Sequence, residues 1–228
     1  MTARAPTHAR VRSIIAAAML ALLAAGCASD SALVSNHIDP VTSVTVSYCQ
    51  TPMVLYRDVS GRAAYARDFV HMAPLEVNRS GDYRYYLWLG IWTTMADAQP
   101  NQSRDGFESI LIFADGEPLP LEIAGWNTSA IGASESVYLK PVASATDAYY
   151  KVTPDQLRLI AEATDIRLQT GGPPRKSYEP SDDQKSARAS LSEFLKSSIF
   201  KPGWRECRTP VTRIPYLQEW NRSLPSVV

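Results

Sequence analysis

Residues 83–92 read Tyr-Arg-Tyr-Tyr-Leu-Trp-Leu-Gly-Ile-Trp, the most distinctive run in the chain. Because side chains alternate along a strand, a strand here has two faces that are both rich in apolar side chains. The first face holds Tyr83, Tyr85, Leu87, Leu89 and Ile91, and the second holds Arg84, Tyr86, Trp88 and Trp92. We interpret the run as a central strand buried on both faces. The alternative is that the second face is a binding platform for a glycan, a peptide or a partner protein, since Tyr, Trp and Arg concentrate at binding hot spots.

Shorter β-type runs surround this strand. From Val41 to Cys49, apolar and hydroxyl side chains alternate, which is typical of a half-buried strand. Further β-rich runs occur at 53–57, 82–94, 107–113, 119–123, 137–142 and 148–152, with turn-forming stretches such as 79–82 and 114–117 between them. The first two thirds of the chain are therefore expected to form a mostly antiparallel sheet.

The last third changes to a helical period. Thr153-Pro154-Asp155-Gln156 offers an N-cap, a proline at the first helical position and a capping-box glutamine, which predicts a helix over about 154–164. A short strand is expected around Ile166 and Leu168. A second helix is expected from about Ser181, with Gln184 completing a capping box and an apolar stripe further along.

These elements predict one α+β domain over residues 41–228. Hydrophobic residues at 45% and charged residues at 20% match an ordinary globular protein. Strands followed by helices place the chain in the α+β class. Beyond Pro202, further prolines exclude a long helix. Trp204, Tyr216 and Trp220 make this last segment too apolar for a free tail, so we expect most of it to pack on the domain.

The N-terminus has the pattern of an export signal. Three arginines precede an uncharged apolar run at 14–25, which is too short to span a bilayer comfortably. The run ends in Leu23-Ala24-Ala25-Gly26-Cys27, which resembles the bacterial lipobox, although that pattern prefers Leu where this chain has Ala24. The resemblance implies a signal peptide over 1–26 and a lipidated Cys27. Cleavage by an ordinary signal peptidase, with Cys27 incidental, is the alternative.

The resemblance to lipoproteins also implies a location. Lipidation at Cys27 would anchor the chain permanently in a membrane, so that the lipid takes the place of a transmembrane helix. Ala28 and Ser29 follow the cysteine rather than Asp, which in Gram-negative lipoproteins favours the outer membrane, facing the periplasm. We expect residues 27–40, rich in serine and small side chains, to form a tether.

Two cysteines remain once Cys27 is assigned to lipid. Because disulfides form and persist in an oxidising compartment, we expect Cys49 and Cys207 to be bonded to each other. Two separate buried thiols are the alternative. The spacing does not fit Cys-x-x-Cys, so the bond would be structural rather than catalytic.

Composition and motifs argue against several functions. After residues 1–26 are removed, the chain carries 20 basic and 23 acidic residues, with no basic run longer than Arg175-Lys176, so nucleic acid is not an expected partner. Histidine is scarce, and neither a zinc motif nor a serine-hydrolase motif is present. The carboxylates lack the spacing of a working pair. We therefore name no catalytic residue, no metal ligand and no cofactor.

Two hypotheses for function remain. The first is a non-enzymatic, lipid-anchored protein that binds another envelope protein, as an accessory subunit of an assembly or secretion system. The second is an envelope enzyme of unfamiliar type, such as a carboxylate-dependent glycan hydrolase. Two carboxylates converging in a cleft would favour the enzyme, whereas an exposed apolar patch would favour binding.

Overall fold

A computed structural model describes residues 33–59, 66–95, 104–182 and 184–199. The predicted signal peptide, Cys27 and Cys207 lie outside these ranges. The fold is α+β, mostly antiparallel sheet with two helices towards the C-terminal end of the described chain. None of the helices in these ranges is both long enough and apolar enough to cross a membrane.

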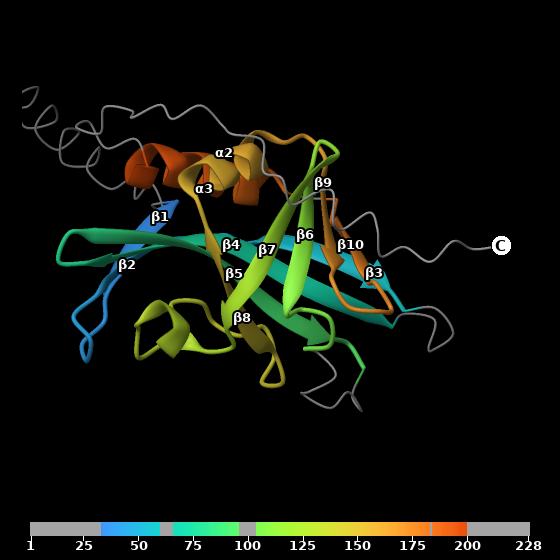
Figure 1. Cartoon of the computed structure of the whole chain (residues 1–228), viewed down its shortest axis with the longest axis horizontal. Coiled ribbons are helices and arrows are strands. Elements are labelled where there is room, and N and C mark those ends of the chain that lie inside the picture. Colours follow the sequence, from blue (N-terminus) through green and yellow to red (C-terminus); the bar gives the residue numbers. More distant parts are fainter. Residues whose placement is uncertain (1–32, 60–65, 96–103, 183, 200–228) are drawn as a thin grey trace, which may run out of the picture.

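Eight strands close into a barrel, shown in Figure 1. In the order in which they pair, these are β4 (Arg67–Arg79), β3 (Met53–Asp58), β10 (Ser177–Pro180), β9 (Ile166–Thr170), β6 (Ser109–Ala114), β7 (Glu117–Gly125), β8 (Thr146–Val152) and β5 (Asp82–Thr93). The pairing of β5 with β4 closes the ring, and all neighbours are antiparallel. A barrel of this size has an interior that side chains can fill.

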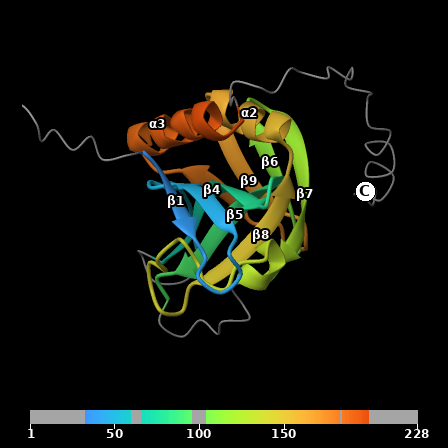
Figure 2. The same cartoon turned by 90° about the vertical axis from the view of Figure 1, so that its left-hand side faces the viewer.

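Two helices cover one end of the barrel. In Figures 1 and 2, α2 (Pro154–Glu162) and α3 (Lys185–Phe194) lie across the strand ends. A π-helical turn, η2 (Leu195–Ile199), continues α3. Leu157, Ile160 and Phe194 from this helical layer join the inward side chains of the strands in one inner core. We call the opposite end, where β3 and β5 end and β4 begins, the far end of the barrel.

The aromatic run 83–92 forms β5, and residues 86–91 are buried without interruption, which confirms its interpretation as a central strand. Leu87, Leu89 and Ile91 belong to the inner core. Tyr86 and Trp88 face the other way, into an outer core. This outer core is completed by β2 (Thr45–Cys49), β4, β8 and the loop that carries the 3-10 turn η1 (Thr128–Ile131).

Trp88 is held on three sides in the outer core. Its ring stacks on Tyr138 with centroids 4.2 Å apart, and its Nε1 donates to Asp147 Oδ1 at 3.1 Å. The indole also lies over Gly90, where a Cβ atom would come within 2.7 Å of it. The glycine in the aromatic run therefore makes room for its neighbouring tryptophan.

β4 is the longest strand, and the sequence patterns do not predict it. Its 13 residues include Pro74 and Glu76, which weaken a strand pattern. On one side β3 pairs with β4 up to Met72, and β2 pairs with it from Leu75 onward. Pro74 therefore lies between the two partners, where a missing N–H is tolerated. Pairing partners, rather than local pattern, make this segment a strand.

Three further expectations for the strands are corrected. Val34–Ile38, part of the predicted tether, form β1, which pairs with β2. Residues 137–142 are irregular, because the segment covers the outer core with Tyr138 alone buried and Leu139 94% exposed. Ser177–Pro180, for which the sequence predicts no strand, form β10 between β3 and β9.

The helix starts differ in how well the sequence predicts them. For α2 the capping box is confirmed, because Thr153 Oγ1 accepts from Gln156 N at 3.2 Å and Gln156 Oε1 accepts from Thr153 N at 2.9 Å. The second helix begins at Lys185 without a side-chain cap. Gln184 instead donates from Nε2 to Val54 O at 3.0 Å, which ties the start of α3 to β3.

Candidate functional site

The far end of the barrel carries polar side chains inside the ring and aromatic side chains outside it. Leu55, Val70 and Ile91 are inner-core residues of β3, β4 and β5. Because side chains alternate, the next inward positions towards the far end are Arg57, Asp68 and Thr93. The positions between them, Tyr56, Phe69 and Trp92, face outward.

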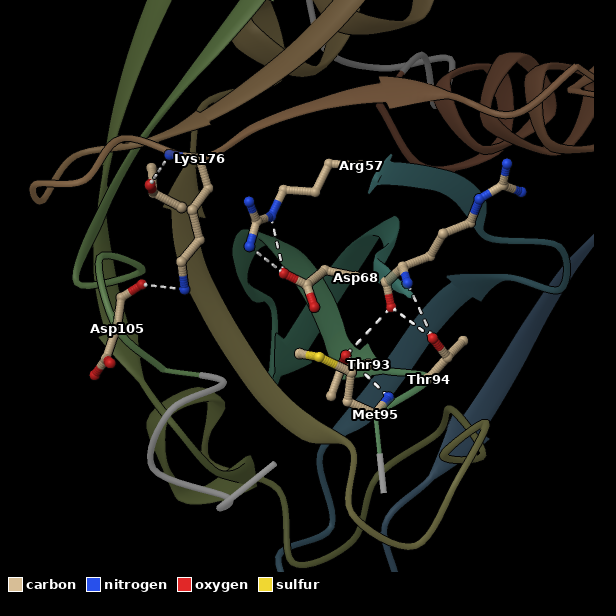
Figure 3. A network of polar contacts seen from close by, with 9 residues as sticks. Arg57, Asp68, Thr93, Thr94, Met95, Asp105 and Lys176 are labelled. Atoms are coloured by element: carbon tan, nitrogen blue, oxygen red, sulfur yellow. Dashed lines mark hydrogen bonds and ion pairs between the residues drawn. The ribbon is translucent and has the colours of Figure 1, made fainter. Parts of the chain in front are cut away.

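Arg57 and Asp68 form an ion pair inside this end, shown in Figure 3. Arg57 Nε donates to Asp68 Oδ2 at 2.8 Å, and the two side chains are 27% and 14% exposed. Burial opposes the charge of Arg57, but Asp68 and Tyr178 outweigh it, so the pKa of Arg57 is raised above its ordinary value. The pair fixes two charges at the boundary between the inner core and solvent.

Aromatic side chains fill the interior beside the ion pair. Phe107, Tyr150 and Tyr178 are buried in the inner core, and the Tyr150 hydroxyl donates to the Phe107 carbonyl at 2.5 Å. Burial raises the pKa of both tyrosines, so both stay neutral. Under the helices, the cavity beside Cys49 holds only about 10 Å³, no more than one water needs. Side chains therefore fill the barrel interior both beside the ion pair and under the helices.

Further polar contacts hold the strand ends together at the far end. Lys176 Nζ donates to the Asp105 carbonyl at 3.3 Å, on the opposite side of the ring from Thr93 and Thr94 (Figure 3). The hydroxyls of Thr93 and Thr94 both donate to the Arg67 carbonyl, at 3.2 and 3.3 Å. These bonds fix the start of β4 against the end of β5.

Tyr56, Phe69 and Trp92 form what we call the outer aromatic row. The register places Tyr56 opposite Phe69 and Phe69 opposite Trp92, so the row runs straight across three strands. Each of the three is half-buried. Phe69 stacks on Trp92 with centroids 4.4 Å apart and 12° between the ring planes, and Tyr56 lies 6.4 Å from Phe69. The row is a continuous apolar strip on the outside of the barrel.

Charged and polar neighbours border the outer aromatic row. The Arg67 guanidinium lies 4.8 Å from the Tyr56 ring centroid, and Arg67 Nε donates to Asp58 Oδ1 at 2.8 Å. On the other side, His71 packs edge-on against Trp92, and burial lowers the pKa of this histidine. The row therefore has a charged border on one side and a largely neutral one on the other.

The ring geometry limits what the row can bind. Phe69 and Trp92 each cover one face of the other, and Arg67 covers one face of Tyr56. A sugar ring binds an aromatic residue by stacking on an open face, whereas protein side chains pack equally well against ring edges. The outer aromatic row therefore offers ring edges together with the ring faces that these contacts leave uncovered.

The four residues of the sequence-predicted platform do not lie together at the surface. Tyr86 and Trp88 are 2% and 1% exposed within the outer core. Arg84 is exposed and pairs with Asp82 at 2.8 Å. Trp92 is the member of that set that belongs to the outer aromatic row. The loop around η1 covers Tyr86 and Trp88 in the middle of β5, but it does not cover Trp92 at the end of the strand.

Cys49 is buried under α3, and its Sγ donates to the Ser190 carbonyl at 3.3 Å. Burial raises the pKa of this thiol to about 12. A thiol with so high a pKa is a poor nucleophile, because the thiolate is the reactive form. The bond to Cys207 stays a prediction, since Cys207 lies outside the described residues.

At the far end, the Asp68 carboxylate faces the interior, and its partner is the Arg57 guanidinium. A glycan hydrolase needs two carboxyl groups placed around one bond, and the ion pair with Arg57 does not supply that arrangement. In the described ranges, no three His, Cys, Asp or Glu side chains are grouped as a metal site.

Sequence patterns indicate part of this site. Tyr56 and Arg57 lie in a predicted strand, where alternation alone puts them on opposite faces. Phe69 and Asp68 lie on β4, which the patterns do not predict, so neither the row nor the ion pair could be assembled from sequence. The register of β3, β4 and β5 was the missing information.

No protein-family model, curated protein or solved structure matches this chain.

Proposed function

We propose that this chain is a lipid-anchored envelope protein that binds a protein partner through the outer aromatic row. The row carries the proposal: three half-buried aromatic side chains and an arginine gather on one outer face, and these residue types supply most of the energy at protein interfaces. A role as an accessory subunit of an envelope assembly or secretion system fits a packed barrel that binds through its outside. The proposed location is the outer membrane, facing the periplasm.

Leu33 and Val34, the first residues that the structure describes, lie beside the helical layer. The Leu33 carbonyl accepts a hydrogen bond from Gln50 N at 3.0 Å. The next residue, Val34, lies opposite Cys49, whose thiol donates a hydrogen bond to the Ser190 carbonyl of α3. The seven steps from a lipidated Cys27 to Val34 span at most about 25 Å, so a membrane anchor would hold this side of the domain close to the bilayer.

The test is in-cell crosslinking and affinity purification of the tagged chain, with matched variants. Tyr56→Ala combined with Trp92→Ala removes two rings of the row, and Phe113→Ala removes a half-buried, outward aromatic side chain from β6 as the control. We expect a reproducible partner with the unaltered chain and the control. The double variant should lose it, because truncating hot-spot residues costs about 2 kcal/mol or more each. Circular dichroism checks that all variants fold.

Two outcomes would contradict the proposal. A partner retained equally by the double variant would place the interface elsewhere. Recovery of glycan without protein would favour the carboxylate-dependent hydrolase instead. Cys27→Ala tests the anchor separately, because it should release the chain from the membrane without affecting the row.

A further inference from the structure

The barrel ladder is interrupted between β7 and β8. Between these strands the described residues pair only at Ile123 with Tyr150 and at Gly125 with Tyr149, with a register shift between the two positions. β7 continues from Ile123 back to Glu117 while paired with β6 alone. We call residues 117–122 of β7, on the side away from β6, the open edge.

The prolines of β7 decide which groups the open edge presents. Ile123 N donates to the carbonyl of Glu108, the residue just before β6. The alternation of an antiparallel pair therefore directs the N–H and C=O groups of odd-numbered β7 residues to β6 and those of even-numbered ones to the open edge. The even positions are Pro118, Pro120 and Glu122. Two of the three have no N–H, so the open edge offers mainly carbonyl acceptors. Such an edge does not pair readily with an ordinary strand.

A groove of about 420 Å³ lies along this edge. It is lined by Pro120, Leu121, Glu122, Ile123 and Ala124 of β7, with Ala130, Lys151 and Gln156 on the other wall. Glu122 and Glu117 are exposed on the edge itself, and Lys151 lies on the opposite wall of the groove. The carbonyl acceptors and the two edge carboxylates together favour an occupant rich in N–H donors.

The C-terminal segment of the same chain has this chemistry. Residues 200–228 hold five basic and two acidic side chains, and four of the basic residues are arginines: Arg205, Arg208, Arg213 and Arg222. Residues 27–199 hold 15 basic and 21 acidic side chains, so the two parts carry opposite net charge. The segment starts after η2, which packs against α2, and α2 also contributes Gln156 to the groove. Its starting point is therefore near the groove.

We propose that the part of this segment after Cys207 docks along the open edge of β7, with Arg213 and Arg222 donating to its carbonyl groups and to Glu122. The donors of a guanidinium suit an edge that can accept hydrogen bonds but hardly donate them. The segment thereby covers an exposed strand edge that would otherwise be available to other chains. This site is separate from the outer aromatic row, so it does not depend on the proposed function.

Photo-crosslinking in the full-length chain tests this docking. A photo-crosslinking amino acid replaces Glu122 in one variant and Glu179, an exposed glutamate on β10, in the control. We expect position 122 to crosslink to peptides from 200–228 in a product of monomer mass, and position 179 not to do so. The yield should fall at high salt, because exposed charge pairs are screened.

Replacing arginines in the segment provides the second measurement. Arg213→Gln with Arg222→Gln should lower the crosslink yield from position 122 about three- to fivefold, the loss expected for two exposed ion pairs. Crosslinks from position 122 that miss 200–228 would overturn the proposal. So would a product of dimer mass, which would put a second copy on the edge, or an equal yield from position 179.

Discussion

Asp39 shows how one buried carboxylate can hold two distant segments together. It is fully buried and accepts hydrogen bonds from Val41 N at 3.0 Å and Thr42 N at 2.8 Å, in the turn between β1 and β2. It also accepts from Ser134 Oγ at 2.8 Å, in the loop that covers the outer core. Burial opposes its ionisation, but hydrogen bonds from Thr42 and Ser134 outweigh burial and hold the pKa of Asp39 well below its usual range.

We predict that Asp39 makes stability depend on pH. A carboxyl whose folded-state pKa is depressed contributes stability that is fully present above its unfolded pKa of about 3.9 and is lost as pH falls below that value. Urea unfolding between pH 7 and pH 3 should show a decline that is smaller in Asp39→Asn, which is already less stable at pH 7. An identical pH profile in the two proteins would contradict this role.

Gly90 leads to a second prediction at the residue scale. Its Cβ position lies 2.7 Å from the Trp88 indole, so Gly90→Ala should destabilise the fold by about 1–3 kcal/mol through overpacking. Chemical denaturation measures this cost. In a Trp88→Leu background the same change should cost clearly less, because the clash is gone. An equal cost in both backgrounds would point to the backbone instead.

At the scale of elements, the Arg57–Asp68 ion pair joins β3 to β4 at the far end. Because each partner is mostly buried, removing one leaves the other charge without compensation. Asp68→Asn alone is expected to destabilise the protein by roughly 1–3 kcal/mol. Replacing both, as Arg57→Met with Asp68→Leu, should restore much of that stability, since apolar pairs often substitute for buried ion pairs. Equal losses in the single and double variants, measured in urea, would argue against a paired role.

The start of α2 is a second feature at this scale. The capping box of Thr153 and Gln156 satisfies backbone N–H groups that the first helical turn leaves free. Thr153→Ala should cost about 1 kcal/mol. Thr153→Ser keeps the hydroxyl and should cost little. Thermal unfolding of the two variants distinguishes loss of the cap from loss of the methyl group.

At the scale of the whole molecule, the predicted Cys49–Cys207 bond would link β2 to the C-terminal segment. It would close a loop of more than 100 residues, which the chain-entropy model values at about 4–5 kcal/mol. We expect no labelling of these two cysteines by iodoacetamide in urea until a reductant is added. Labelling in urea alone would establish separate thiols. The native protein is uninformative, because burial already keeps Cys49 unreactive.

The barrel shows why local patterns predict some elements and not others. β5 and α2 carry their own signals, an unbroken apolar run and a capping box, and both are present. β4 and β10 carry weak signals and exist because neighbouring strands pair with them on both sides. Without these two strands, the closure of the sheet could not be predicted, since β4 pairs with β5 to close the ring and β10 joins β3 to β9.

The class of the fold, the central position of β5 and the start of α2 can be predicted from local sequence, because they depend on alternation and capping within a few residues. The barrel, the covering of Tyr86 and Trp88, and the outer aromatic row become visible only in the folded chain. The row joins Tyr56, Phe69 and Trp92 from three strands. Which side chains meet across strands depends on register, and register is set by packing of the whole sheet rather than by any one segment.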